Sequence, residues 1–371
     1  MRSYEQVQEN LKRRPRAWLV TGAAGFIGSH VVQALLKLDQ RVVGLDNLSA
    51  GSRGNLTQVA AAVTETEWRN FRFLQGDINA IDTCRQACRG VDYVLHQAAL
   101  GSVSRSVADP VCANENNVTG FMNMLVAAQG AGVARFVYAG SSAVYGDDTG
   151  IPKIEEHVGR PLSPYAATKR VDEMYADVFA RCFGLGSIGL RYFNVFGPRQ
   201  EANGPYAAVI PVWIAAMLRN EIACIFGDGE TTRDFCYVDN VVRANVLAAT
   251  VEDPAAANQV YNVAMGCRTS LNELFETIRS LLEGRYAHLR GLKPVYRDFR
   301  HGDVLHSQAD ISKAQRLLGY FPNWRLTEGL SRTIDWFADR LAAPRPIGAQ
   351  SGREPFDLIF NDRVTPLLNI K

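Results

Sequence analysis

Residues 17–28 read Ala-Trp-Leu-Val-Thr-Gly-Ala-Ala-Gly-Phe-Ile-Gly, in which an apolar run is followed by three glycines spaced three residues apart. Its first five residues predict a buried strand, and the apolar spacing from Phe26 to Leu38 predicts a helix. Between them, Gly22 permits a tight turn, Gly25 lets the backbone approach a pyrophosphate, and Gly28 lets the helix pack closely on the sheet. A helix that begins here offers free N–H groups and a positive dipole end to an anion.

Further short apolar runs follow, and each ends in polar or glycine residues. They cover residues 41–45, 71–74, 91–95, 135–139 and 187–190. Helical spacing lies between them, most clearly at residues 111–130 and 163–183. Strands that alternate with helices predict right-handed crossovers, and hence a doubly wound, mostly parallel α/β sheet of the Rossmann type. Ligands of such sheets bind beyond the carboxyl ends of the strands.

The rhythm changes after Gly197, where helical stretches and short strands alternate irregularly. This change predicts a smaller α/β lobe for the substrate, with some crossing of the chain between the lobes. The expected segments are an N-terminal extension (1–16), the nucleotide-binding Rossmann domain (17–197), the smaller lobe (198–341) and a C-terminal tail (342–371).

The composition argues against several kinds of partner. The 371 residues hold 40 basic and 38 acidic side chains, so we expect no general attraction to nucleic acid or anionic lipid. No run of about eighteen apolar residues occurs, and residues 1–16 lack the apolar stretch of a signal peptide. The 7 cysteines are scattered without a Cys-x-x-Cys pair. We therefore expect a reduced, cytoplasmic protein without a metal site or a membrane span.

A carboxylate at the end of the second strand specifies the nucleotide. Asp46 lies 18 residues beyond Gly28, where it can accept hydrogen bonds from the hydroxyls of an adenine ribose. No arginine directly follows it to hold a 2′-phosphate, so the sequence favours NAD over NADP. Asp77 and Ile78, after the third strand, are expected at the edge of the adenine.

A tyrosine and a lysine four residues apart predict the chemistry. Tyr165 and Lys169 share one face of the predicted helix. A free tyrosine is a poor base at neutral pH, but a nearby ammonium favours its phenolate. Ser141 and Ser142 end a strand about two dozen residues earlier, and a serine there can bond the substrate oxygen and pass its proton to the tyrosine. His96 is interpreted as part of a strand-end wall, not as the base.

These motifs together resemble the UDP-hexose 4-epimerases of the extended short-chain dehydrogenase/reductase family over residues 17–340. The matching segments are TGAAGFIG (21–28), GLDN (44–47), GDI (76–78), HQAA (96–99), SS (141–142), YAATK (165–169), LRYFNV (190–195), GDG (227–229), RDF (233–235) and RHGD (300–303). A more specific resemblance is to bacterial UDP-N-acetylglucosamine 4-epimerases of O-antigen and capsule synthesis. It rests on LGSV (100–103), YAAVIP (206–211) and HSQAD (306–310).

The resemblance implies a reaction, a site and an assembly. A UDP-sugar held by its diphosphate would lose the proton of its 4-hydroxyl to Tyr165 and a hydride from C4 to NAD. The resulting 4-keto sugar would rotate so that its other face meets the cofactor, and the hydride would return to that face. Helices 111–130 and 163–183 would form a homodimer. The implied catalytic residues are Ser141, Ser142, Tyr165 and Lys169. The implied NAD-binding residues are Gly22, Gly25, Phe26, Ile27, Gly28, Asp46, Asn47, Asp77, Ile78, Gln97, Ala98, Ala99, Tyr165, Lys169 and Tyr192. The implied substrate-binding residues are Gly101, Ser102, Ser141, Asn194, Ala208, Val209, Arg233, Arg300, Asp303 and Ser307.

Ser307 bears on the sugar. It stands where UDP-galactose 4-epimerases often carry a tyrosine, so the resemblance implies room for an N-acetyl group and interconversion of UDP-GlcNAc and UDP-GalNAc. Epimerisation of a UDP-N-acetylhexosaminuronic acid, with Arg105 as a candidate partner of the carboxylate, and of UDP-glucose or UDP-galactose stay open. So do a net NAD-dependent dehydrogenase, a nucleotide-sugar dehydratase and a catalytically dead NAD-binding sensor. A dehydratase typically carries Asp-Glu where Ser142 and Ala143 stand, and a sensor usually lacks the Tyr–Lys pair.

Overall fold

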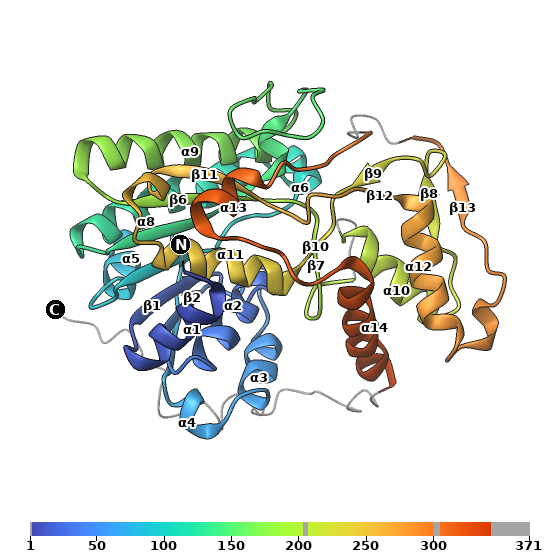
Figure 1. Cartoon of the computed structure of the whole chain (residues 1–371), viewed down its shortest axis with the longest axis horizontal. Helices are drawn as coiled ribbons and strands as arrows, with labels where there is room; N and C mark the ends of the chain where they lie inside the picture. Colours follow the sequence, from blue (N-terminus) through green and yellow to red (C-terminus); the bar gives the residue numbers. More distant parts are fainter. Residues whose placement is uncertain (1, 203–206, 300–304, 343–371) are drawn as a thin grey trace.

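A seven-stranded parallel sheet forms the centre of the computed structural model, which describes residues 2–202, 207–299 and 305–342 (Figure 1). Its strand order is β11-β6-β5-β4-β1-β2-β3. The strands are β1 (Ala17–Thr21), β2 (Arg41–Asp46), β3 (Phe71–Gln75), β4 (Tyr93–His96), β5 (Arg135–Ser141), β6 (Ser187–Tyr192) and β11 (Gln259–Val263). The order reverses between β1 and β4, and the crevice beyond their carboxyl ends is the place where such sheets bind ligands. The predicted Rossmann-type α/β fold is confirmed.

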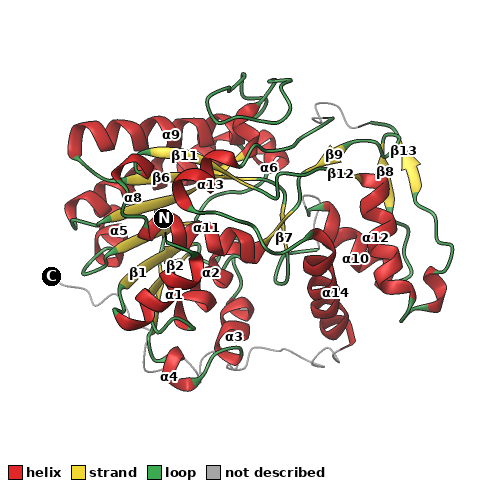
Figure 2. Ribbon diagram, viewed as in Figure 1, coloured by secondary structure: helices red, strands yellow, loops and turns green. Residues whose placement is uncertain are grey.

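Helices cover both faces of the sheet and bury a separate core on each side (Figure 2). One face is covered by α2 (Phe26–Leu36) and α11 (Val238–Thr250), with α3 (Arg53–Ala61) beside α2. The other face is covered by α5 (Ile81–Ala87), α8 (Gly120–Gly130) and α9 (Pro164–Phe183). The Rossmann domain also contains shorter helical segments, which are α4 (Glu65–Trp68), α6 (Val103–Ala108), α7 (Pro110–Asn114), the π-helical turn η1 (Glu115–Thr119) and the 3-10 turn η2 (Ser142–Tyr145).

The N-terminal extension contains a helix that the sequence analysis did not predict. Helix α1 (Tyr4–Arg13) begins with a capping box between Ser3 and Gln6. Val7 and Leu11, four residues apart, are buried in the core on the α11 side of the sheet. The Arg243 guanidinium of α11 lies 4.5 Å from the centre of the Tyr4 ring. The two apolar residues at helical spacing are the sequence signal, which the polar and basic composition of the segment obscured.

The smaller lobe lies to one side of the large sheet (Figure 1). It packs around its own apolar core, which includes Trp213, Phe275 and Leu330. Its elements are β7 (Val195–Phe196), α10 (Val209–Leu218), β8 (Cys224–Phe226), β9 (Thr232–Arg233), β10 (Cys236–Tyr237), β12 (Thr269–Ser270), α12 (Leu271–Glu283), η4 (Ala287–Leu289), β13 (Val295–Arg297) and α14 (Leu326–Ala342). The short strands form three two-stranded sheets: β10 with β7, β12 with β9, and β13 with β8.

The chain crosses between the lobes. After β10 it returns to the large sheet, where α11 covers one face and β11 pairs in parallel with β6. The 3-10 turn η3 (Pro254–Ala256) precedes β11, and α13 (Ser312–Leu318) packs against it. Residues 238–263 therefore contribute a helix and a strand to the Rossmann domain, although they follow Gly197 in the sequence. Within the described part of the chain, no helix has the length and apolar character needed to cross a membrane.

Candidate active site

The glycine loop turns sharply between β1 and α2. Gly22 has a φ of +66°, which side chains other than glycine rarely adopt. A Cβ added to Gly28 would lie 2.0 Å from the Gly22 carbonyl oxygen, so the loop and the helix leave no space for one. Gly25 precedes α2, and no side chain of the described residues caps the first N–H groups of this helix. The cradle thus offers backbone donors to a diphosphate, which fits the pyrophosphate of NAD.

Asp46 lies at the end of β2, beside the loop. Its two carboxylate oxygens accept hydrogen bonds from the Ala24 N–H at 2.9 Å and the Leu48 N–H at 2.7 Å. Burial raises the pKa of Asp46, and these two N–H groups oppose the rise. Asn47 donates to the Asp77 carboxylate at 2.9 Å, which ties the ends of β2 and β3 together. The contacts of Asp46, Asn47, Asp77 and the buried Ile78 with an adenosine stay predictions.

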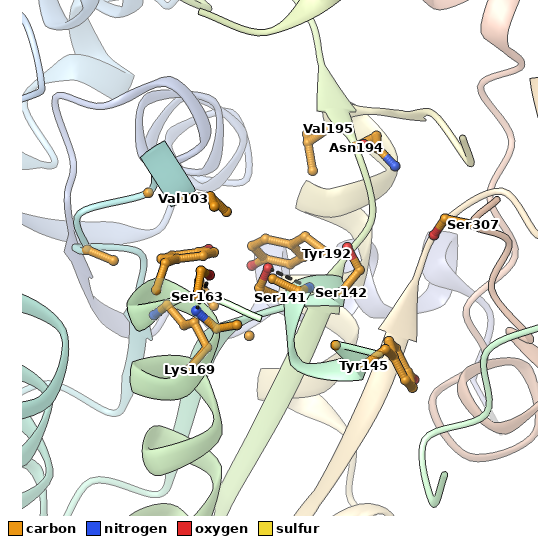
Figure 3. A pocket seen from close by; sticks show the side chains of 18 of the residues that line it. Val103, Ser141, Ser142, Tyr145, Ser163, Lys169, Tyr192, Asn194, Val195 and Ser307 are labelled. Atoms are coloured by element: carbon orange, nitrogen blue, oxygen red, sulfur yellow. Dashed lines mark hydrogen bonds between the residues drawn. The ribbon is translucent and has the colours of Figure 1, made fainter. Parts of the chain in front are cut away.

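The predicted triad faces one cavity of about 580 Å³, part of which is shown in Figure 3. Ser141 ends β5, paired with Tyr192 of β6, and its Oγ accepts a hydrogen bond from the Ala143 N–H. Tyr165 is the second residue of α9, and its backbone N–H donates to the Ser106 Oγ at 3.0 Å. Lys169 follows one helical turn later. Ser141, Ser142, Tyr165 and Lys169 all line the cavity.

Lys169 is buried and is paired with a carboxylate that the sequence analysis did not single out. Its Nζ lies 3.0 Å from the Oδ2 of Asp172, one turn further along α9. Burial lowers the pKa of the Lys169 ammonium, but Asp172 and Tyr165 more than offset this, so the pKa is raised overall. The lysine is therefore positively charged beside the phenol of Tyr165.

His96 is unsuited to act as a base. It is buried at the end of β4, where its Nδ1 lies 2.9 Å from the Thr21 Oγ1 and its ring packs against Phe121 and Phe136. Burial, with a smaller effect of Lys169, lowers the pKa of His96 to about 3. The imidazole is neutral at physiological pH and does not line the cavity, which agrees with the prediction that His96 is not the base.

Three amide and phenol groups close a ring of hydrogen bonds beside the triad. Gln97 donates to Asn245 at 2.9 Å, Asn245 donates to the Tyr192 hydroxyl at 2.9 Å, and that hydroxyl donates back to Gln97 at 3.0 Å. Gln97 and Tyr192 line the cavity, whereas Asn245 lies buried on α11. The ring fixes the cavity wall to the helix behind it. Asn245 was not predicted, because its partners are distant in sequence.

A second buried amide fixes the catalytic helix. Asn117, in the π-helical turn η1, accepts a hydrogen bond from the Leu100 N–H at 2.7 Å and donates to the Thr168 hydroxyl at 3.0 Å. It thus links the loop after β4 to the residue that precedes Lys169. The role of Asn117 could not be predicted from the sequence, since an asparagine inside a helical pattern carries no distinctive spacing.

Four further predicted substrate residues line the same cavity, and they are Gly101, Asn194, Arg233 and Ser307. Figure 3 shows Asn194 and Ser307 on the side of the cavity opposite Val103. The Arg233 Nη1 donates to the Thr232 carbonyl at 3.0 Å. The next residue, Asp234, is buried and accepts hydrogen bonds from the N–H groups of Met265, Gly266 and Ala309, which holds the segment that carries Arg233. Burial raises the pKa of Asp234 to about 6.

Other predicted residues lie elsewhere. Ser102 caps α6 through a hydrogen bond from the Arg105 N–H, and Ala208 and Val209 stand at the beginning of α10; none of the three lines the cavity. Arg105 does not line it either. Arg300 and Asp303 lie outside the described residues. Lining residues that the sequence analysis missed are Val103, Ser104, Ala139, Gly140, Ala143, Tyr145, Gly146, Lys153, Leu162, Ser163, Ala166 and Val195.

Comparison with known proteins gives the family. The model of the NAD dependent epimerase/dehydratase family matches residues 18–264. The chain belongs to this family. A putative UDP-glucose 4-epimerase of Methanocaldococcus jannaschii is 38% identical over 320 residues, which cover 86% of this chain and 97% of the relative. The cofactor of the family is NAD, and the glycine cradle fits it.

Two solved structures share the fold and differ in their sugars. A UDP-N-acetylglucosamine 4-epimerase from Methanobrevibacter ruminantium, in complex with UDP-N-acetylmuramic acid, has a TM-score of 0.80 and 39% identity, covering 88% of this chain and 99% of that one. A UDP-glucuronic acid 4-epimerase from Bacillus cereus, with UDP-glucuronic acid and NAD, has a TM-score of 0.76 and 32% identity over 88% of this chain and 99% of that one.

Proposed function

We propose that this protein is an NAD-dependent UDP-sugar 4-epimerase and that its substrates are UDP-GlcNAc and UDP-GalNAc. The observation that carries the proposal is the shared cavity: Tyr165, Lys169 and Ser141 face the same space as Arg233 and Ser307. A base, a hydroxyl relay, a diphosphate partner and room for a substituent therefore meet at the sheet edge beside the glycine loop.

The cavity residues divide the reaction between them. Ser141 orients the sugar 4-hydroxyl, and the Tyr165 phenolate removes its proton, with the Lys169 ammonium stabilising the phenolate. NAD, when bound, supplies the redox chemistry by accepting the C4 hydride and giving it back. Arg233 holds the diphosphate while the 4-keto sugar turns its other face to the site. Tyr165 then returns the proton to the C4 oxygen, which becomes the inverted 4-hydroxyl. Because the hydride has also gone back to the sugar, no cofactor is consumed.

The charges around the cavity favour a neutral sugar over a uronic acid. Among the described lining residues the cations are Lys153, Lys169 and Arg233. Lys153 is paired with Asp148 at 2.9 Å and Lys169 with Asp172 at 3.0 Å. Arg233 is assigned to the diphosphate. Both of these lysines are thus already paired with a carboxylate. Burying the carboxylate of a uronic acid beside them would cost free energy, because neither lysine could compensate its charge without leaving its partner.

A dehydratase lacks its acid here. Elimination needs a group that protonates the leaving hydroxyl, and no aspartate or glutamate occurs among the described residues that line the cavity. Ser142 and Ala143 stand where the Asp-Glu pair of dehydratases would be. Epimerisation needs no such acid. The intact Tyr165–Lys169 pair likewise supports an active enzyme over an NAD-binding sensor.

Comparing three substrates tests the choice of sugar. We expect the kcat/KM for UDP-GlcNAc to exceed those for UDP-glucose and UDP-glucuronic acid, each measured by NMR detection of the 4-epimer. A higher kcat/KM for UDP-glucuronic acid would contradict the proposed substrate while leaving the proposed reaction intact.

Ser307→Tyr is expected to reverse the preference for the acetamido sugar. The larger ring fills space that a serine leaves open, so turnover of UDP-GlcNAc should fall at least about tenfold, while turnover of UDP-glucose stays within about threefold. Ser307→Ala, which keeps the space, is the control and should retain both activities. Equal losses for the two sugars in Ser307→Tyr would show that Ser307 does not set the size limit.

We propose a homodimer through α7, α8 and α9. Met174 and Val178, four residues apart on α9, are 59% and 39% exposed, and Val111 of α7 is 66% exposed. Apolar side chains gathered on helices that pack together mark an interface. Light scattering after gel filtration is expected to give about twice the 40.9 kDa chain mass. Met174→Glu/Val178→Glu should give monomers; a monomeric wild type would reject the dimer.

We place the reaction in the cytoplasm, where it would supply an activated sugar for cell-surface polysaccharides. The seven cysteines are all free thiols, which fits a reducing compartment.

A further inference from the structure

Asp172 is a buried carboxylate in the wall behind the cavity. Its side chain is 1% exposed, and the Lys169 side chain beside it is 3% exposed. The two belong to the same face of α9, where Lys169 lies between Tyr165, four residues before it, and Asp172, three residues after it. Burying an ionised carboxylate costs several kcal/mol unless a partner compensates for the lost hydration. The Lys169 ammonium, 3.0 Å away, is that partner.

The neighbouring carboxylate shows what a purely structural role looks like. Glu173 is also buried, and both of its oxygens bind the Arg191 guanidinium, at 2.7 Å and 2.9 Å. It joins α9 to β6. Asp172 makes no comparable link: its Oδ1 is buried and has no hydrogen-bond partner among the described residues. The hydrogen bond that Asp172 makes goes to the lysine that lines the cavity.

The other titratable groups around the pair do not replace Asp172. On α9 these are Tyr165 and Glu173, and Glu173 is engaged by Arg191. From β4, His96 faces Lys169 but is neutral at physiological pH, because burial lowers its pKa to about 3. From β5, Tyr138 faces the carboxylates, and burial raises its pKa well above the usual value, so it stays protonated. Asp172 is therefore the carboxylate that compensates the Lys169 charge.

We propose that Asp172 is a positioning residue, whose carboxylate fixes the Lys169 ammonium in the cavity wall and keeps it charged for Tyr165. This rests on the proposed function, in which the Lys169 charge stabilises the phenolate. Burial removes water from the ammonium and favours its neutral form. The carboxylate restores the charge, and its anchorage on the same helix keeps the amine within reach of the tyrosine.

Burial raises the pKa of Asp172 to about 6, and Lys169 opposes the rise, so the carboxylate is ionised above neutrality. Removing its charge should let Lys169 lose a proton at a lower pH. An opposite charge this close shifts a pKa by roughly one to three units.

The test measures the protonation of Lys169 directly. The chain has seven lysines, so a lysine-labelled sample gives few side-chain NMR signals, and Lys169→Met identifies that of Lys169. We expect Asp172→Asn to lower the apparent pKa of the Lys169 ammonium by about one unit or more. Asp172→Glu, which keeps the charge, should restore most of the difference. A pKa within about 0.3 units of wild type in Asp172→Asn would overturn the proposal.

Activity against pH gives the second readout. Wild-type kcat should change little between about pH 8 and pH 10, whereas kcat of Asp172→Asn should fall at least about twofold over that range as Lys169 loses its charge. Asp177→Asn removes an exposed carboxylate of the same helix and should behave like wild type. If the kcat of Asp172→Asn depended on pH above pH 8 in the same way as that of the wild type, the proposal would be overturned.

Two measurements distinguish a failure of this proposal from a failure of the proposed function. The NMR titration needs no substrate, so it stands whether or not the chain epimerises UDP-GlcNAc. If the wild type epimerises UDP-GlcNAc and Tyr165→Phe does not, the proposed function holds. An unchanged Lys169 pKa in Asp172→Asn would then overturn the role of Asp172 alone. Asp172→Ser is made in parallel with Asp172→Asn. If neither variant folds, as judged by circular dichroism and thermal melting, Asp172 has a structural role and the proposal is overturned.

Discussion

Tyr165→Phe is expected to lower the rate of epimerisation by about a thousandfold while NAD stays bound. The variant keeps the ring that packs in the cavity and loses only the oxygen that removes the 4-hydroxyl proton. The backbone N–H of residue 165 still donates to Ser106, so the beginning of α9 is undisturbed. The measurement is single-turnover and steady-state conversion of UDP-GlcNAc, with the NAD content of each sample determined after denaturation.

Tyr175→Phe is the matched control. Tyr175 belongs to the same helix, packs partly buried against the core and does not line the cavity, so its loss should leave the rate within about twofold. Unchanged turnover in Tyr165→Phe would remove the residue from its role. Equal losses in both variants would show that the helix, and not the phenolate, is what the reaction requires.

Gly28→Ala is expected to leave the purified protein without NAD and without activity. The added Cβ would lie 2.0 Å from the oxygen and 2.7 Å from the carbonyl carbon of Gly22. Both atoms are backbone, so the glycine loop must move away from α2 and the diphosphate cradle is lost. Overpacking of this kind also costs about 1–3 kcal/mol of folding free energy. The measurements are the NAD released per chain and the thermal midpoint.

Gly130→Ala is the control for the loss of a glycine. Gly130 ends α8, and a Cβ there would meet no atom of the described part of the chain within 4 Å. This variant should keep its NAD and melt near the wild-type temperature. Stoichiometric NAD in Gly28→Ala would contradict the assignment of the loop as the cofactor cradle.

The fold could be predicted wherever local pattern and tertiary structure agree. Apolar runs that end in polar residues identified six of the seven strands of the large sheet. The seventh, β11, was missed. It follows the irregular elements after Gly197, and the sequence of a short strand does not indicate which sheet the strand joins. The pairing of β11 with β6 is a contact between distant segments. Helix α1 was missed because its two buried residues stand in a polar segment.

The residues of the candidate site that belong to sequence motifs could be predicted, but the residues that hold them in place could not. Ser141, Tyr165 and Lys169 follow recognisable spacings, and the structure brings them to one cavity. Asn117, Asn245 and Asp172 support them through contacts that depend on the packed fold. Asn245 reaches Gln97 across 148 positions of sequence. An asparagine or aspartate within a helical pattern is usually solvated, so only the burial of these side chains reveals what they hold.

Incubation of UDP-GlcNAc that carries deuterium at C4, with purified protein and no added cofactor, tests whether the hydride taken from the sugar returns to it. We expect UDP-GalNAc that keeps its deuterium at C4, because the same hydride leaves the sugar and returns to it. We also expect the NAD bound at the end to equal the NAD bound at the start. Exchange of the C4 label with solvent, a net loss of NAD, or no UDP-GalNAc from protein with NAD bound would contradict the proposed epimerisation.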